Sequence, residues 1–281
     1  MGEPDFVTPQ SFRAAASTSI KDGVTHYTSN YGLIELRQAV SEHIEKLYKV
    51  SYSPENEIII TIGSSEGLML ACHALIDPGD ELITPDPYYV AYPPCVSLTG
   101  GTMVTVPTSA KNQFRLQAKD LESRITDNSK ILLIGYPANP TGTQMTLEDV
   151  QSIASVVERH NLMVISDETY DRLSYDIKHT CFSSLPGMKE RTVLLGSTSK
   201  SYAMTGCRIG WACAPAKIIE AMMKVHQYII MSAPTPSQYA ALEALTNGEA
   251  ETQRMAANFN KRRHLFLDGL DNIGLPYHKP E

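Results

Sequence analysis

Residues 131–142 read ILLIGYPANPTG, a short apolar run that ends in glycine, proline and polar residues. Short runs rich in isoleucine, leucine and valine are typical of buried β-strands. The same pattern recurs three times, as IIITIGSSE at 58–66, LMVISDETY at 162–170 and VLLGSTSK at 193–200. Weaker strand candidates lie at 81–84, 103–106 and 209–214.

Helical segments lie between these strands. Apolar residues recur at three- and four-residue steps along 33–47, and 67–76 is apolar on all sides. Thr146 to Asp149 forms a capping-box pattern before a further helix. From Lys217 onward the pattern is helical, including a long stretch from about 251 to 267. Strands alternating with helices predict an α/β fold with a mostly parallel sheet flanked by helices.

Polar side chains follow the four clear strands. The exits carry Ser64 and Ser65, Asn139, Asp167 and Lys200. In open α/β sheets ligands bind beyond the carboxyl ends of the strands, so we expect these residues to converge. Taken singly, each of these residues has a common structural role that needs no ligand. Serine caps helices, Asn-Pro forms turns, aspartate forms Asx-turns and lysine is a surface charge. The combination is what favours a site.

Composition excludes several classes of function. The 281 residues are 42% hydrophobic and 20% charged, with a formal net charge of -7, so neither disorder nor general nucleic-acid binding is expected. We predict no membrane partner, because no apolar run approaches the roughly 20 residues that span a bilayer. No signal peptide or CxxC is visible, which favours a cytoplasmic protein, and the histidines show no metal spacing, so no metal is expected.

The order of four motifs resembles the class I/II aminotransferases of the fold-type-I pyridoxal-phosphate (PLP) family. These motifs are Asn139-Pro140-x-Gly142, Asp167-x-x-Tyr170, Ser197-x-Ser199-Lys200 and Arg208. The resemblance begins at Gly2 and covers nearly the whole chain. It implies the fold-type-I architecture and PLP as cofactor.

The resemblance implies roles for the residues at the strand exits. Lys200 would form an aldimine with PLP and move the proton between the substrate Cα and the cofactor. Asp167 would pair with the pyridine nitrogen, while Asn139 and Tyr170 would bond the ring oxygen. The phosphate would be held by a set of hydroxyls and one guanidinium: Ser64, Ser65, Ser197, Ser199 and Arg208.

Three further positions match the family at the edge of its site. Tyr89 matches an aromatic residue that stacks on the cofactor, and Tyr88 next to it is the alternative for this position. Tyr27 matches a tyrosine that reaches the phosphate of a neighbouring subunit, which implies a homodimer with shared active sites. Gly2 matches a glycine near the substrate carboxylate.

The chain departs from the family at its end. It stops at Glu281, whereas the family continues through the rest of a small domain that carries an arginine for the substrate carboxylate. We expect an N-terminal segment of the small domain at 1–23, a PLP-binding large domain at 24–250, and an interdomain helix with an incomplete small domain at 251–281. We also expect apolar residues of the last helix to face water, namely Met255, Phe259, Leu265 and Phe266. Such a chain would bind PLP but transaminate poorly.

The predicted function is an aminotransferase that moves an amino group between an L-amino acid and a 2-oxo acid through a Lys200 aldimine. A PLP-dependent β-lyase on the same fold would use Lys200 equally well. A truncated homologue with little activity is a further alternative. A non-catalytic effector-binding domain ranks lowest, because no DNA-binding helix-turn-helix precedes Gly2 and the chain is acidic.

Overall fold

The computed structural model describes residues 2–281. The helices in this range are α1 (Gln10–Lys21), α2 (Ile34–Tyr48), α3 (Gly63–Leu75), α4 (Tyr92–Ser97), α5 (Ala118–Glu122), α6 (Leu147–Arg159), α7 (Ala216–Ile229), α8 (Thr235–Asn247) and α9 (Glu249–Asn272). The strands are β1 (Ile58–Thr61), β2 (Glu81–Asp86), β3 (Thr102–Pro107), β4 (Ser129–Gly135), β5 (Met163–Asp167), β6 (Thr192–Ser197) and β7 (Gly210–Cys213). All seven predicted strands are therefore confirmed.

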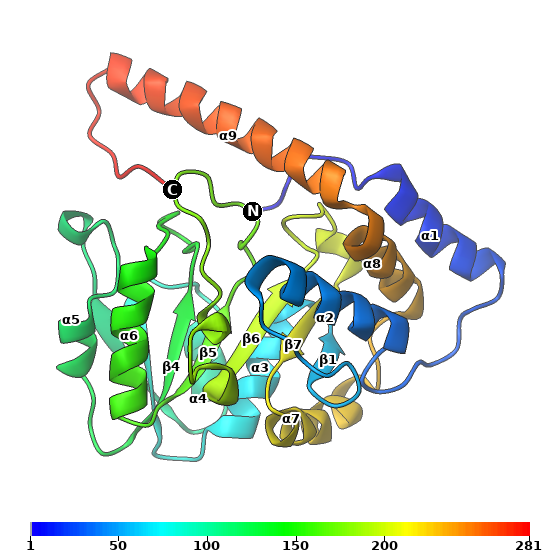
Figure 1. Ribbon diagram of the computed structural model, residues 1–281, viewed down its shortest axis with the longest axis horizontal. Coiled ribbons are helices and arrows are strands. Elements are labelled where there is room, and N and C mark those ends of the chain that lie inside the picture. Colours follow the sequence, from blue (N-terminus) through cyan, green and yellow to red (C-terminus); the bar gives the residue numbers. More distant parts are fainter. Residues whose placement is uncertain (1) are drawn as a thin grey trace.

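The strands form one sheet in the order β1-β7-β6-β5-β4-β2-β3. Neighbouring strands from β6 to β3 pair in parallel, which confirms the predicted mostly parallel sheet. β7 is antiparallel to both β6 and β1, a reversal that the sequence pattern did not indicate. The β6–β7 connection, residues 198–209, contains a 3₁₀ turn but no α-helix of the kind that usually carries a parallel crossover. β1, β4, β5 and β6 all end at the same edge of the sheet (Figure 1).

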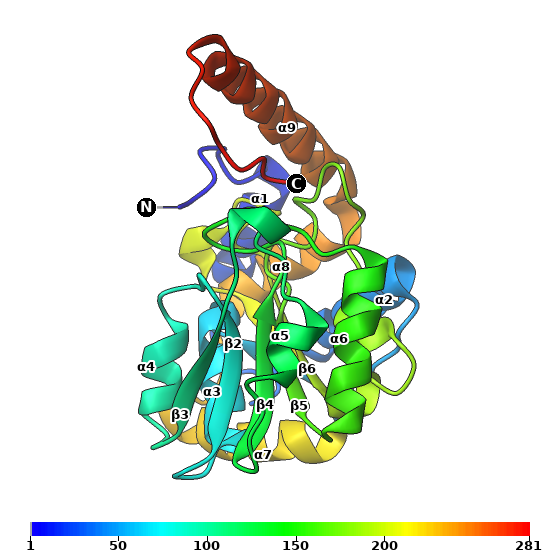
Figure 2. The ribbon, with the colours of Figure 1, turned by 90° about the vertical axis from the view of Figure 1, so that its left-hand side faces the viewer.

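Helices cover both faces of the sheet. Alternate residues of β1 enter different cores: Ile59 packs with the cluster of α3 and α7, whereas Ile58 and Ile60 pack with that of α2 and α8. On β4, Leu133 faces α3 while Leu132 faces α6. Figure 2 shows α3 and α4 on one side of the sheet and α5 and α6 on the other. The two-residue period of the strands thus builds a three-layer α/β sandwich.

The two end helices differ from expectation. The sequence analysis missed α1, whose Phe12 is buried in the core shared with α8. The prediction that four apolar residues of α9 face water is half wrong: Met255 is buried, and Phe259 packs edge-on against Phe6 with ring centroids 5.1 Å apart. Leu265 and Phe266, by contrast, are 75% and 69% exposed.

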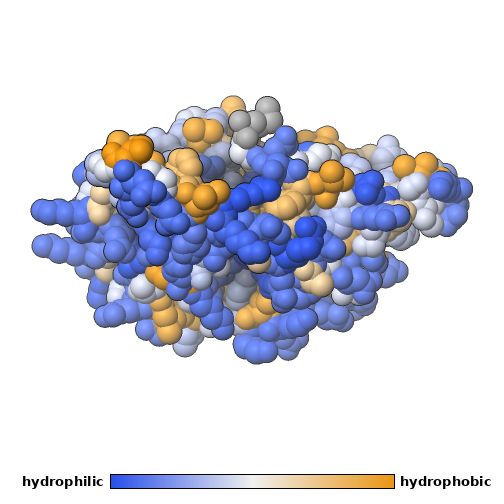
Figure 3. Space-filling model, turned by 90° about the horizontal axis from the view of Figure 1, so that it is seen from above, coloured by the Kyte–Doolittle hydropathy of each residue, from blue (hydrophilic) through white to orange (hydrophobic). Residues whose placement is uncertain are grey.

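The surface of the molecule carries scattered apolar side chains. Viewed from above, it is mainly hydrophilic with separate hydrophobic patches (Figure 3). Within residues 2–281, no helix combines the length and the hydropathy that crossing a membrane requires.

Candidate active site

A cavity of about 530 Å³ opens at the carboxyl edge of the sheet. Ten of the twelve predicted site residues line it: Gly2, Ser64, Ser65, Tyr89, Asn139, Asp167, Tyr170, Ser199, Lys200 and Arg208. Seven of these groups come from the exits of β1, β4, β5 and β6, as expected for strands that end at one edge. Tyr89 follows β2, and Arg208 lies just before β7. The N-terminal segment closes one side, through Gly2 and Glu3.

Asp167 ends β5 with its carboxylate directed into the cavity. Its Oδ1 accepts hydrogen bonds from the Thr169 N–H at 3.3 Å and the Thr169 hydroxyl at 2.8 Å. Its Oδ2 accepts one from the Tyr92 hydroxyl at 3.2 Å. Burial raises the pKa of Asp167, and the neighbouring Glu168 charge acts in the same direction. A cation placed beside Asp167 would favour the charged carboxylate.

Lys200 follows β6 and faces the cavity with its amine. Nζ donates a hydrogen bond of 2.5 Å to the Gly2 carbonyl and lies 5.8 Å from the centroid of the Tyr170 ring. Burial lowers the pKa of Lys200, and the Arg208 charge adds to this, while Glu3 opposes it. The lowered pKa favours the neutral, nucleophilic amine.

The N-terminus of α3 forms the polar floor of the cavity. The helix begins at Gly63, earlier than predicted, so Ser64 and Ser65 lie in its first turn. Ile62, the residue before the helix, provides no side-chain cap, which leaves first-turn N–H groups free for a ligand. The Arg208 guanidinium lies against Gly63, where an added Cβ would come within 2.6 Å of it. A cation and a helix N-terminus together favour an anion here.

Tyr92 is the main site residue that the sequence analysis missed. It is buried, lines the cavity and donates to Asp167. Its ring meets that of Tyr89 edge-on, with centroids 5.8 Å apart. The available signal was its spacing, three residues after Tyr89, which suits a turn; the Tyr92 N–H donates to the Tyr89 carbonyl at 3.0 Å.

Two predicted site residues do not line the cavity. Ser197 is buried behind it, where its hydroxyl donates to the Ser199 hydroxyl at 2.8 Å and accepts from the Ser199 N–H at 3.0 Å. Tyr27 is 76% exposed and borders a separate hollow. Ser197 therefore acts on the cavity through Ser199, and Tyr27 has no contact with this chain's own cavity.

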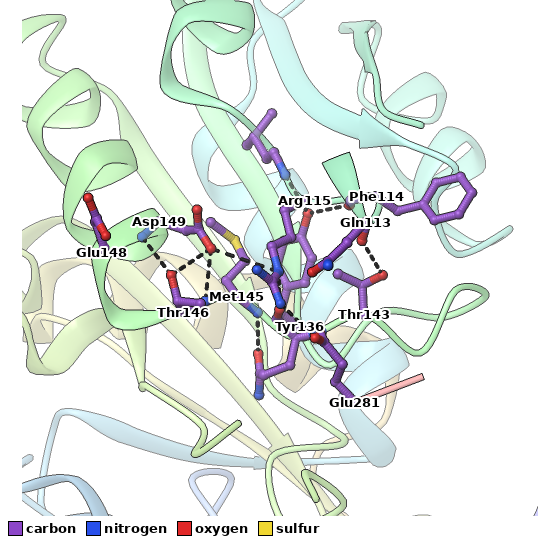
Figure 4. A network of polar contacts seen from close by, with 12 residues as sticks. Gln113, Phe114, Arg115, Tyr136, Thr143, Met145, Thr146, Glu148, Asp149 and Glu281 are labelled. Atoms are coloured by element: carbon purple, nitrogen blue, oxygen red, sulfur yellow. Dashed lines mark hydrogen bonds and ion pairs between the residues drawn. The ribbon is translucent and has the colours of Figure 1, made fainter. Parts of the chain in front are cut away.

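A network beyond the cavity fixes the loop that carries Asn139. At the start of the loop, the Tyr136 hydroxyl accepts from the Leu116 N–H at 3.2 Å. At its end, Thr146 and Asp149 form the predicted capping box of α6. Arg115 lies between these points and pairs with Glu281 at 2.6 Å (Figure 4).

The sequence matches the family described as aminotransferase class I and II over residues 1–281. The chain belongs to this family. A Bacillus subtilis protein that bears the name "Putative aminotransferase YugH" is 44% identical over 280 residues, which cover 100% of this chain and 72% of the relative. An aspartate aminotransferase of Pyrococcus abyssi is 39% identical, and the match covers 100% of this chain and 73% of the relative.

Solved aminotransferase structures have the same fold. The aromatic aminotransferase from Pyrococcus horikoshii superposes with a TM-score of 0.97 and 39% identity, covering 100% of this chain and 76% of that one. The aspartate aminotransferase from Thermus thermophilus with maleate superposes with a TM-score of 0.96 and is 36% identical. The match covers 100% of this chain and 73% of that one. The fold-type-I architecture is thus confirmed, and so is an aminotransferase, an enzyme class that depends on PLP.

The groups in the cavity fit PLP. Its phosphate is an anion and suits the uncapped first turn of α3 with the Arg208 guanidinium. Its pyridine nitrogen can carry a proton and suits the buried Asp167 carboxylate, because a neighbouring cation offsets the cost of burying that charge. Its aldehyde requires an amine, and Lys200 is the one lysine that lines the cavity among residues 2–281.

Proposed function

We propose that this aminotransferase binds PLP in the 530 Å³ cavity and transfers an amino group between an L-amino acid and a 2-oxo acid. The observation that carries the proposal is the meeting of Lys200, Asp167, Asn139 and Arg208 on one cavity from three strand exits and the β6–β7 connection. The amine of Lys200 matches the PLP aldehyde, and the carboxylate of Asp167 matches the ring nitrogen. The amide of Asn139 matches the ring oxygen, and the guanidinium of Arg208 matches the phosphate.

Each residue has a separate task in this proposal. Lys200 Nζ attaches the cofactor and, once released, carries the proton that leaves the substrate Cα. Asp167 keeps the ring nitrogen protonated, with its own orientation fixed by Thr169 and Tyr92. Bound PLP supplies an electron sink for the pair left behind at Cα.

The remaining groups orient the cofactor. Asn139 and Tyr170 bond the ring oxygen, and Tyr89 stacks on the ring. The phosphate is held by Ser64, Ser65, Ser199 and Arg208, while Ser197 fixes the Ser199 hydroxyl. Binding energy at the phosphate serves mainly to hold the reacting atoms in place.

A donor panel tests the function. Relatives are named for aspartate and for aromatic amino acids, so the panel should contain both groups with 2-oxoglutarate as acceptor. We expect glutamate to form from at least one donor, and Lys200→Ala to abolish its formation. Release of ammonia and pyruvate without an acceptor, and no glutamate from any donor, would instead indicate β-lyase chemistry.

A further inference from the structure

Glu66 and His226 form a buried pair beside the first turn of α3, outside the cavity. His226 Nδ1 lies 2.8 Å from Glu66 Oε1, and the His226 side chain is fully buried. Glu66 Oε2 accepts a hydrogen bond of 2.5 Å from the Ile62 N–H. The pair therefore links α7 to Ile62, the residue between β1 and α3, just before Ser64 and Ser65 in the first turn of α3.

The imidazole of His226 has a single polar contact. Its Nε2 is buried and has no hydrogen-bond partner within residues 2–281. Because a carboxylate oxygen can only accept, Nδ1 donates in the contact with Glu66. The polar contribution of His226 is therefore confined to holding the Glu66 carboxylate.

Glu66 occupies a position from which it could obstruct the site. Acidic side chains in a first helical turn are attracted to the N–H groups at their own N-terminus. If the Glu66 carboxylate turned to the N–H groups at Ser64 and Ser65, it would occupy those donors and repel an incoming phosphate. In the structure its Oε2 accepts from the N–H of Ile62, the residue before the helix, and its Oε1 is held by His226. The first-turn donors consequently remain free.

We propose that His226 is a positioning residue that keeps the Glu66 carboxylate away from the phosphate-binding donors of α3. This inference rests on the proposed function, in which Ser64, Ser65 and Arg208 hold the PLP phosphate. His226 should therefore affect binding of the PLP phosphate and not of the cofactor ring or aldehyde, because the groups assigned to those parts belong to other elements.

The test compares PLP with pyridoxal, which lacks the phosphate. His226→Leu removes the Nδ1 donor and keeps an apolar side chain, whereas His226→Asn retains an N–H near the same place. We expect His226→Leu to raise the Kd of the cofactor-free protein for PLP about tenfold. Its Kd for pyridoxal should stay within about twofold of wild type, and inorganic phosphate should compete less well with PLP. His226→Asn should resemble wild type.

A second substitution identifies the cause. Adding Glu66→Gln to His226→Leu removes the charged competitor, so most of the PLP affinity should return. Equal losses of PLP and pyridoxal binding in His226→Leu, or no loss of PLP binding, would overturn the proposal.

Glu66→Gln alone covers the case in which His226→Leu does not fold. We expect its PLP affinity to equal or exceed that of wild type, and a selective loss would overturn the proposal. Failure of the phosphate site itself has a different signature: wild type would bind PLP no better than pyridoxal, and Arg208→Ala would leave PLP affinity unchanged.

Discussion

Burial shifts Asp167 and Lys200 toward their neutral forms. It raises the pKa of the Asp167 carboxyl and lowers the pKa of the Lys200 ammonium. For Lys200 the neutral form is the reactive one. For Asp167 a neighbouring cation, such as a protonated ring nitrogen, would oppose the effect of burial and favour the charged carboxylate. The two residues are thus suited to opposite ends of the same cofactor ring.

The raised pKa of Asp167 predicts a pH-dependent cost to folding. Since the folded carboxyl holds its proton to higher pH than the unfolded one, stability falls as pH rises from about 4 through the raised pKa. In the cofactor-free protein, Asp167→Asn should therefore gain stability over wild type as pH rises through this range. With PLP present the order should reverse. Urea unfolding over a pH series checks both, and a pH-independent difference would contradict the shift.

Tyr92→Phe tests the donor that fixes Asp167. The substitution keeps the buried ring and removes the 3.2 Å hydrogen bond. Because one such bond contributes about 0.5–1.5 kcal/mol, kcat should fall roughly two- to tenfold with little change in KM for the amino donor. Tyr89→Phe serves as the control, since it keeps the ring proposed to stack on the cofactor. Equal effects of the two substitutions would remove the special role of Tyr92.

At the scale of elements, β7 and α3 meet through two glycines. A Cβ at Gly210 would lie 2.5 Å from the Gly63 carbonyl carbon and 2.6 Å from the Ser64 nitrogen. These are backbone atoms, which cannot move aside as a flexible side chain can. The close approach lets Arg208, on the connection into β7, reach the first turn of α3.

The added methyl group of Gly210→Ala should force β7 away from α3, because it would overlap the backbone of Gly63 and Ser64. We expect unfolding stability to fall by about 1–3 kcal/mol and the Kd for PLP to rise. Gly269→Ala is the matched control, because nothing lies within 4 Å of its added Cβ. Thermal melts and PLP titrations measure both effects. A stable Gly210→Ala protein with wild-type PLP affinity would show that the contact is not needed.

The sequence predicted elements best where local chemistry decides them. The capping box at Thr146 and the buried strand runs depend on neighbouring residues, and both were found. The reversed direction of β7 depends on its partners, and α1 depends on contacts that bury Phe12 against distant helices. The spacing of Tyr92 from Tyr89 was visible in the sequence, but its hydrogen bond to Asp167 joins residues 75 positions apart and depends on the fold.

At the scale of the whole molecule, Tyr27 remains a prediction. It borders a hollow lined by 25–27 and 232–236, and the nearby chain exposes Tyr228, Ile229 and Met231. Exposed apolar side chains close to the predicted shared residue are what a homodimer interface requires. The domain division near residue 250 is likewise still a prediction.

Hybrid dimers test the role of Tyr27. A hybrid dimer contains one Tyr27→Phe subunit and one Lys200→Ala subunit. If Tyr27 acts across the interface, the site of the Tyr27→Phe subunit has its own Lys200 and receives the intact Tyr27 of its partner. Mixing the two inactive or weakened proteins should therefore restore activity. No recovery, despite exchange of subunits shown by mass, would place Tyr27 in its own subunit's chemistry or outside the site.

The central claim is that the fold delivers Lys200 to PLP. Incubation of the protein with PLP, borohydride reduction and mass analysis of the peptides measures this directly. We predict a pyridoxyl group on Lys200 alone, and its loss when Arg208→Ala weakens phosphate binding at low PLP. A label on another lysine, in protein that retains its fold, would contradict the account.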